Sequence, residues 1–298
     1  MAIVQTASGW RKFGTVTKYT LLTIGAFIML APFADMFLGA LRTPAERMAQ
    51  PPVYFPRDPQ WGNYARVFTE LPMLRWMGNS LFVTASVTAL QLLTSAMAGY
   101  ALAKYHFKGR DLLFRSVLGA QMFPFFLFLI PIFFILRYFP LIGGNDLLGQ
   151  GGSGFLNSYS AIIIPFAVTW YGIFLMRQFF MALPDELIDA ARLDGAGEFR
   201  IFFVIALPLV LPGLATLGIF VFVYQWNEVI WTMTVTRTSP DYQTIPVGIY
   251  LLRGAFIDQS TRSLQQAALA VSILPVIVTF LLLQRYYVRG LTAGAVKG

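Results

Sequence analysis

The stretch LFVTASVTALQLLTSAMAGYAL, residues 81–102, decides the fold class of this chain. It contains no Asp, Glu, Lys, Arg or His, and a helix rising about 1.5 Å per residue over this length crosses the roughly 30 Å hydrocarbon layer of a bilayer. Similar stretches lie on both sides of it, and only the first of them contains a charged residue, Asp35. The sequence therefore predicts an all-α integral membrane protein with six membrane-spanning helices, at residues 19–41, 81–102, 116–136, 159–176, 201–225 and 264–284.

Composition supports lipid as the main solvent of the folded chain. Apolar residues make up 57% and charged residues 12% of the 298 positions, and the net charge of +8 comes from basic residues scattered between apolar runs. Because they form no basic stripe, they do not indicate a nucleic-acid partner. The chain has no cysteine and a single histidine, His106, so we expect no disulfide, no metal ligands, no cofactor-binding residues and no catalytic residues.

The basic residues also predict the orientation of the chain. An even number of spans places both termini on one side, and with the termini in the cytoplasm 13 of the 22 Lys and Arg residues are cytoplasmic and 9 are external. The short loop at residues 104–115 is the densest basic segment, as the positive-inside rule expects. The apolar run after Arg11, Lys12 and Lys18 is too long for a secretory signal, so it is interpreted as a retained first span.

Proline residues recur inside the predicted spans. Each removes a backbone donor and favours a kink, although membrane helices also tolerate proline without a functional reason. The sequence thus predicts bent helices at Pro32, Pro124, Pro131, Pro165, Pro208, Pro212 and Pro275.

The loop between the fourth and fifth spans, LPDELIDAARLDGAGEFR at residues 183–200, holds five of the fourteen acidic residues. Pro184 at its start, acidic residues in the first turns, Arg192 late and Gly195 beyond the end are typical of a short capped helix. Leu187, Ala190 and Ala191 would form its apolar face. Helix physics alone leaves two interpretations open, a helix that docks on another protein and a connector that binds nothing.

Three segments resemble a known family. The string DAARLDGAGEFRIFFVIALPLVLPG, residues 189–213, resembles the EAA loop of permeases from binding-protein-dependent ATP-binding-cassette importers. QWNEVIW at residues 225–231 and RGLTAGAVKG at residues 289–298 are similar to the carbohydrate branch, the relatives of maltose and glycerol-phosphate permeases. The resemblance covers residues 76–298. Asp189 departs from the usual Glu, which shortens its reach by one methylene group.

The resemblance implies a type I importer permease fold and a bacterial inner-membrane location. It implies a non-catalytic subunit that forms part of the pathway for a sugar or sugar derivative. Its partners would be a second, different permease chain, two cytoplasmic ATPase subunits that hold ATP and Mg²⁺, and an external solute-binding protein. The sequence has no Gly-rich loop ending in Lys-Ser or Lys-Thr, in keeping with ATP hydrolysis by partners.

The resemblance also assigns parts of the chain. Residues 1–75 would hold the N-terminus, first span and an external loop, residues 76–285 the permease core, and residues 286–298 a cytoplasmic tail. The coupling loop at residues 183–200 would bind an ATPase subunit, with Asp189 paired to a basic residue there. The expected coupling residues are Asp185, Glu186, Leu187, Asp189, Ala190, Ala191, Asp194 and Gly195, with Gly195 in a left-handed turn.

Candidate pathway residues form a polar stripe on the second span and clusters near the ends of the fourth and fifth. The stripe has helical spacing, and packing through small and hydroxyl residues explains it as well as a sugar pathway does. Gln91 is least explained by packing, since its amide needs several partners. The candidates are Thr84, Thr88, Gln91, Ser95, Trp170, Tyr171, Gln225, Trp226 and Asn227.

Two other classes compete with an ATP-driven importer. An ion-coupled secondary transporter usually places an ionisable residue at the centre of a span, and an integral membrane enzyme needs paired carboxylates, a metal cluster or a nucleophile motif. Neither pattern is evident in the sequence, and the loop at residues 183–200 favours the importer.

Overall fold

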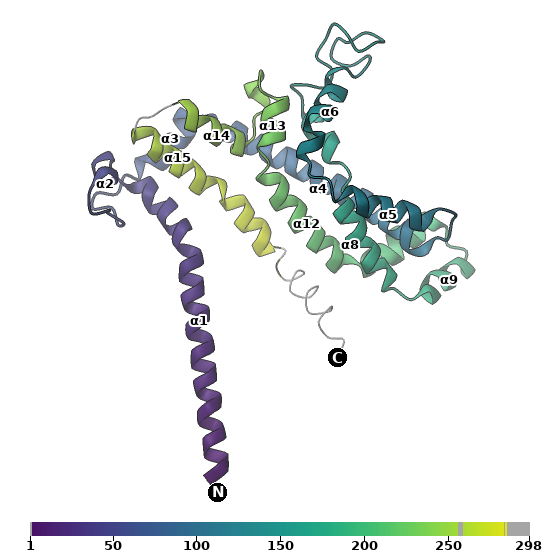
Figure 1. Cartoon of the computed structure of the whole chain (residues 1–298), viewed down its shortest axis with the longest axis horizontal. Coiled ribbons are helices and arrows are strands. Elements are labelled where there is room, and N and C mark those ends of the chain that lie inside the picture. The colour runs from purple at the N-terminus through teal and green to yellow at the C-terminus, as the bar shows by residue number, and fades with distance from the viewer. Residues whose placement is uncertain (1, 256–258, 283, 285–298) are drawn as a thin grey trace. The chain divides into compact units, whose positions relative to one another are not determined.

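The computed structural model describes residues 2–255, 259–282 and 284, and the chain divides into two compact units. The first unit comprises Met1–Pro72 with Leu252–Ile273, and the second comprises Met73–Leu251 with Leu274–Gly298. Every regular element in the described ranges is a helix (Figure 1), which confirms the all-α prediction.

In the first unit, the long helix α1 (Ala2–Leu41) packs against α15 (Gln259–Ser272) and is followed by α2 (Pro44–Met48) and α3 (Gly62–Glu70). Thr43 and Glu46 form a capping box at the start of α2. The buried Asn63 side chain of α3 donates a 2.8 Å hydrogen bond to the carbonyl oxygen of Ala40. Since that carbonyl lies in the last turn of α1, this bond supplies it with a partner.

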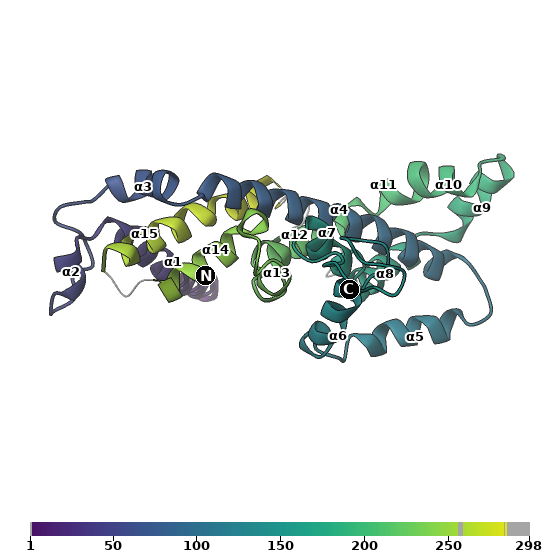
Figure 2. The same ribbon diagram turned by 90° about the horizontal axis from the view of Figure 1, so that it is seen from above.

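The second unit is built on α4 (Met73–Lys104), which packs along α8 (Trp170–Met181) and α12 (Leu211–Trp226) (Figure 2). Between α4 and α8 lie α5 (Arg110–Ala120), α6 (Phe126–Arg137), α7 (Tyr159–Ile163) and η1 (Ile164–Phe166). After α8 come α9 (Asp185–Leu193), α10 (Glu198–Arg200), the π-helical segment η2 (Ile201–Ala206) and α11 (Leu207–Leu209). The unit continues through α13 (Ile230–Val235) and η3 (Pro240–Tyr242) into α14 (Ile245–Ala255).

Three helical segments are long and apolar enough to cross a membrane without interruption: Gly14–Leu41, Met73–Lys104 and Arg262–Leu282. Two bent helix pairs are long and apolar enough when each pair is counted as one span, Tyr159–Phe166 with Trp170–Met181 at 45° and Glu198–Leu209 with Leu211–Trp226 at 79°. The predicted span at residues 116–136 is divided between α5 and the short apolar α6. The structure thus supports several spans, and the count of six is not matched one for one.

Proline accounts for the two bends. Pro165 lies in η1, just before the break that precedes α8, and Pro208 and Pro212 flank Val210, where the 79° bend occurs. Each lacks the backbone N–H that would continue the helical ladder. Pro32 and Pro131, by contrast, lie inside α1 and α6.

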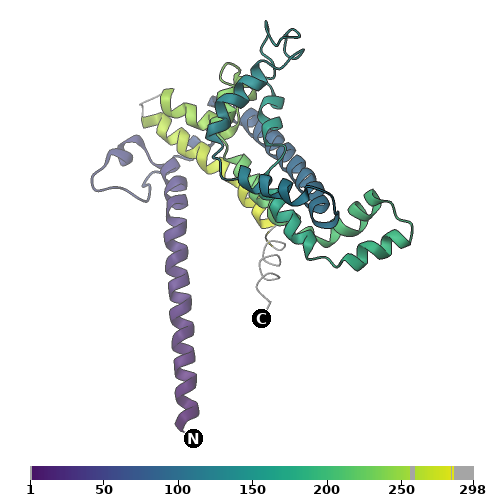
Figure 3. The same cartoon turned by 45° about the vertical axis from the view of Figure 1, so that its right-hand side comes forward.

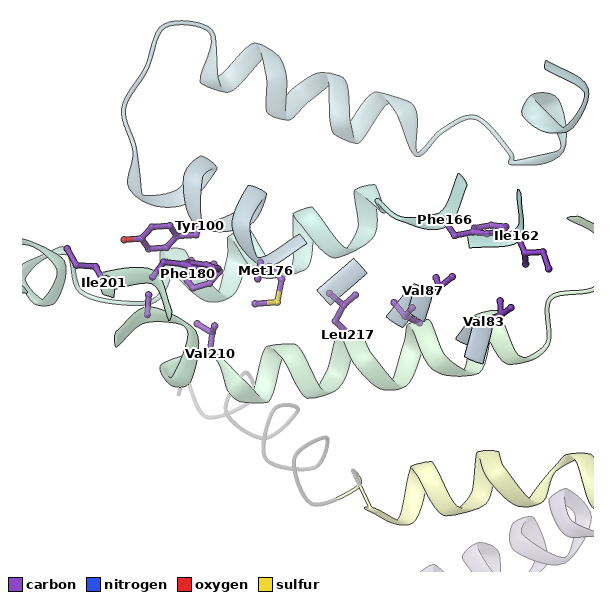
Figure 4. Close-up of a cluster of buried hydrophobic side chains, with 14 of the residues drawn as sticks. Val83, Val87, Tyr100, Ile162, Phe166, Met176, Phe180, Ile201, Val210 and Leu217 are labelled. Atoms are coloured by element: carbon purple, nitrogen blue, oxygen red, sulfur yellow. The ribbon is translucent and has the colours of Figure 1, made fainter. Parts of the chain in front are cut away.

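The core of the second unit lies where α4, α8, η2 and α12 meet. Tyr100, Met176, Phe180, Ile201 and Leu217 gather there (Figure 4), and all are 3% exposed or less.

Glycine permits the close approach of α4 and α8 in this core. A Cβ atom on Gly99 would lie 2.8 Å from the backbone nitrogen of Arg177, and one on Gly172 would lie 2.2 Å from Oγ of Ser95. Such close small-residue contacts are typical of packed membrane helices.

Candidate functional site: the α9 loop and an aromatic pocket

The α9 helix is defined by its two ends. Pro184 precedes its first turn, where Asp185 and Glu186 face the positive end of the helix dipole. At the other end Gly195 has φ of +77°, its N–H bonds to the carbonyl of Arg192, and the N–H of Ala196 bonds to the carbonyl of Ala191. These two bonds form a Schellman motif. The prediction of a left-handed turn at Gly195 is confirmed.

The α9 helix buries one face and exposes the other. Ile188 and Ala191 are 2% and 7% exposed and belong to the core, whereas Leu187 is 46% and Leu193 90% exposed. The expected outward face of Leu187, Ala190 and Ala191 is therefore wrong at Ala191, because that side chain packs inward. The exposed apolar face consists of Leu187, Ala190 and Leu193. Burying an exposed leucine against a partner contributes about 1.5–3 kcal/mol.

Two acidic residues of the 183–200 loop are engaged by the end of α4 and the residue after it. Lys104 Nζ lies 2.5 Å from Asp185 Oδ1 and also donates to the carbonyl of Leu183 at 2.6 Å. Tyr105 donates a 2.6 Å hydrogen bond from its hydroxyl to Glu198 Oε2. These contacts attach the beginning of α9 and the residue that begins α10 to neighbouring positions.

Arg192 completes the cluster. Its Nε lies 2.8 Å from Glu198 Oε1 and its terminal nitrogen 3.1 Å from Asp189 Oδ1. The hydrogen bonds from Arg192 and Tyr105 lower the pKa of Glu198 below its ordinary 4.5, and the bond from Lys104 lowers that of Asp185 below its ordinary 3.8. Burial, followed by the bond to Glu198, raises the pKa of Tyr105 to about 12. Glu198 and Asp185 are therefore ionised at neutral pH, and Tyr105 keeps its proton.

A cavity of about 530 Å³ lies beside the break between η1 and α8. It brings together three predicted pathway residues, Gln91, Trp170 and Tyr171, and is lined mainly by aromatic and aliphatic side chains. Its size and its few polar groups are typical of a small-molecule site. The remaining lining residues are Phe125, Phe128, Ile132, Pro165, Phe166, Val168, Thr169, Phe220, Val221 and Tyr224.

Gln91 and Thr94 of α4 support this break. The Gln91 amide donates to the carbonyl of Phe166 at 2.7 Å, and the Thr94 hydroxyl lies 2.9 Å from the carbonyl of Ala167. In a membrane interior such carbonyls need a partner, because no lipid tail supplies one. Gln91 thus has a structural role as well as a place on the pocket wall.

The other predicted pathway residues do not share the pocket. Thr84 and Ser95 are fully packed, and Thr88 lines a separate apolar cavity between α4 and α12. Gln225 is 4% exposed and its amide has no hydrogen-bond partner within the described residues. Trp226 is buried against Phe222, while Asn227 is exposed.

Glu228, in the QWNEVIW segment, anchors α13. Its two carboxylate oxygens accept hydrogen bonds from the backbone N–H groups of Trp231 and Thr232 and from the Thr232 hydroxyl, at 2.6–2.9 Å. The fully buried Trp231 indole donates to the carbonyl of Ala161 at 2.9 Å. This part of the segment therefore fixes α13 against α7.

Sequence reasoning missed two groups of residues. Lys104 and Tyr105 contact the α9 region, and their only sequence signal is a basic-aromatic pair at the end of a span. Glu198 lies in the predicted coupling loop but is absent from the expected coupling residues. The phenylalanines of the pocket carry no signal, because they lie among the 28 phenylalanines of an apolar chain. No cluster of three or more potential metal ligands occurs among the described residues.

Comparisons with known proteins extend over most of the chain. It is 35% identical to the arabinooligosaccharides transport system permease of Halalkalibacterium halodurans, over 93% of this chain and 96% of that protein. It is 32% identical to the sulfoquinovosyl glycerol transport system permease of Agrobacterium fabrum, over the full length of both.

A chain in the crystal structure of a bacterial ABC transporter involved in the import of the acidic polysaccharide alginate has the same fold. The TM-score is 0.77 at 25% identity, and the match covers 93% of this chain and 97% of that chain. These relatives are transport proteins, which confirms a non-catalytic ABC importer permease subunit. Residues 92–293 match the model for the binding-protein-dependent transport system inner membrane component, and the chain belongs to that family.

Proposed function

We propose that this permease subunit carries a sugar or sugar derivative across the bacterial inner membrane and that α9 is its docking helix for a cytoplasmic ATPase subunit. ATP and Mg²⁺ are held by two such partner subunits. A second, different permease chain completes the pathway, an external binding protein delivers the solute, and both termini face the cytoplasm.

The exposed face of α9 is the observation that carries the docking proposal. Leu193 is 90% exposed at the end of a helix whose opposite side is anchored in the core. An apolar face on a short, well-capped helix is suited to a groove on another protein. Asp189 is exposed and bonds Arg192 of its own helix, so its carboxylate can exchange this surface partner for a basic residue of the ATPase.

The aromatic pocket supports a carbohydrate substrate. Sugar rings present apolar faces and hydroxyl edges, and Trp170 and Tyr171 beside the Gln91 amide offer aromatic surface next to a polar group. The named relatives transport arabinooligosaccharides and sulfoquinovosyl glycerol. We assign a glycan or glycoside to this chain because its pocket combines an aromatic surface with a polar group.

The docking proposal is tested with Leu193→Asp, which places a charge on the exposed face. The tagged complex should retain less ATPase subunit on purification, and transport should fall with it. Leu147→Asp is the matched control, since Leu147 is 75% exposed and its loop lies at the opposite end of the second unit from α9 (Figure 3). Full retention of the ATPase and normal transport by the Leu193 variant would contradict docking through α9.

Orientation is tested by single cysteines, because the chain contains none. Lys108→Cys should be protected from a membrane-impermeant maleimide in intact cells, and Leu148→Cys, at an 80% exposed position, should be labelled. The reverse pattern would invert the assigned topology.

A further inference from the structure

Helix α4 is the longest helix of the second unit and has no break. It runs over 32 residues, Met73–Lys104, which corresponds to about 48 Å at 1.5 Å per residue. The spans that pack against it, through α8 and α12, are both bent. A helix with an uninterrupted hydrogen-bond ladder resists bending, whereas a helix interrupted by proline bends at the break.

The N-terminal part of α4 holds the segment that leads through η3 into α14. The Asn79 amide donates to the carbonyls of Asp241 and Gln243 at 2.7 and 2.8 Å, and its oxygen accepts the Tyr159 hydroxyl at 2.7 Å. Arg75 forms an ion pair with Asp241. Asn79 is 5% exposed, so these bonds are shielded from competing solvent.

The C-terminal end of α4 holds α9. Lys104 forms an ion pair with Asp185 at the beginning of the docking helix, and Tyr105 donates a hydrogen bond to Glu198, just beyond the end of that helix. The Lys104 side chain is only 4% exposed while that of Asp185 is 74% exposed. Removal of the carboxylate would leave a nearly buried cation with one carbonyl partner, which makes this contact costly to break.

We propose that α4 is a strut that joins the external segment at residues 236–245 to the ATPase-docking helix, with Asn79 as the positioning residue at one end and Lys104 and Tyr105 at the other. This inference rests on the proposed function, since it uses the assigned orientation and the docking role of α9. Arrival of the solute-loaded binding protein on the external face then biases the position of α9 through one rigid element.

The experiment is a double-mutant cycle in the complete transporter reconstituted in liposomes. Asn79→Leu and Lys104→Met should each reduce the stimulation of ATP hydrolysis by the binding protein at least about fivefold, the lower end of usual coupling between sites. In Asn79→Leu, unstimulated hydrolysis and the amount of bound ATPase should be unchanged, because Asn79 lies at the other end of α4 from the docking helix. The double variant should be no worse than the more severe single variant, because both act through one element.

Residues 79 and 104 are about 37 Å apart along a helix, so independent effects would multiply. Multiplicative losses, or normal stimulation in either single variant, overturn the strut. Lys108→Met is the control, since Lys108 is exposed and has no ion pair in the described structure. If Asn79→Leu or Lys104→Met fails to accumulate, Tyr159→Phe and Tyr105→Phe replace them in the double-mutant cycle. Each removes one hydroxyl group, which bonds to Asn79 at one end of α4 and to Glu198 at the other.

Failure of the proposed function gives a different result. If α9 does not dock on the ATPase, Leu193→Asp retains both the bound ATPase and transport. If only the strut is wrong, Leu193→Asp still loses the ATPase while the cycle between Asn79 and Lys104 shows multiplicative effects.

Discussion

The Gln91 amide nitrogen lies 2.7 Å from the carbonyl oxygen of Phe166, which joins the middle of α4 to the break before α8. Phe166 ends η1, and Pro165 beside it interrupts the helical ladder. A glutamine in the middle of an apolar span thus supplies the donor that the broken span lacks. The same side chain forms part of the pocket wall, so a substitution at Gln91 affects both the break and the pocket.

Gln91→Met should destabilise the permease, because methionine has a similar length but no donor and leaves the Phe166 carbonyl unpaired. We expect a loss of about 1–3 kcal/mol, measured as a lower melting temperature of the purified complex. Thr94→Ser retains its hydroxyl and serves as the control, with an unchanged melting temperature. Equal melting temperatures for Gln91→Met and the unmodified protein would show that this hydrogen bond contributes little.

Glu228→Leu should loosen α13, since it removes the acceptor for the N–H groups of Trp231 and Thr232. Loss of a helix-capping group costs about 0.5–2 kcal/mol. Hydrogen exchange at residues 230–235 should accelerate, while exchange in α9 stays the same. Glu228→Gln retains one acceptor oxygen and should give an intermediate exchange rate. An exchange rate as fast as that of Glu228→Leu would show that the negative charge of Glu228, and not its hydrogen bonds alone, stabilises α13.

Sequence reasoning predicted the elements whose causes are local. The spans follow from uncharged apolar runs, the end of α9 from Gly195, and the bends from Pro165 and the Pro208–Pro212 pair. In each case the deciding residue lies inside the element that it shapes or within two residues of its end.

The remainder depends on contacts between distant positions. The pairing of Lys104 with Asp185 spans 81 residues and that of Tyr105 with Glu198 spans 93, so neither is visible as a local pattern. Ala191 has helical spacing both from Leu187, on the exposed face, and from Ile188, on the buried face, so spacing alone does not decide where it lies. The packing of α9 on η2 determines which face is buried.

Gly195→Val should uncouple the docking loop through backbone strain alone. Nothing lies within 4 Å of a Cβ atom at this position, so no steric contact opposes the new side chain. A left-handed conformation costs a residue other than glycine about 1–2 kcal/mol, and more for a β-branched one. Transport and stimulated ATP hydrolysis should fall together. Gly195→Asn, which tolerates this conformation, should retain most of both activities, and equal defects in the two variants would argue against backbone strain.

Acidification should weaken the contacts that Glu198 and Asp185 make around α9, because it protonates both carboxylates. Glu198 and Asp185 have lowered pKa values in the folded chain, so their stabilisation is fully present above their ordinary values of 4.5 and 3.8 and is lost as pH falls through the lower folded values. Tyr105, raised to about 12, keeps its donor proton at neutral and moderately alkaline pH. The protection factors of the α9 amides, which are exchange rates corrected for the intrinsic pH dependence of amide exchange, should therefore be constant between about pH 6 and 9 and fall below about pH 4. In Tyr105→Phe the protection of residues 196–200 should be lower at neutral pH.

Tyr171→Ala should alter recognition of the solute more than assembly. Tyr171 is half-buried, lines the pocket beside Trp170 and packs edge-on against Phe220 at 5.7 Å. The substitution removes an aromatic surface that would contact a sugar ring. Loss of this contact costs about 0.5–1.5 kcal/mol in addition to the loss of buried apolar area. The KM for transport should therefore rise by about 2–12-fold. Tyr171→Phe removes only the hydroxyl and should have a smaller effect if ring stacking dominates. Tyr250→Ala, at a half-exposed tyrosine that does not line this pocket, is the control and should leave the KM unchanged. An unchanged KM in Tyr171→Ala, for neutral oligosaccharides and for sulfonated or phosphorylated glycosides alike, would remove this pocket from the solute pathway and leave its aromatic residues a packing role.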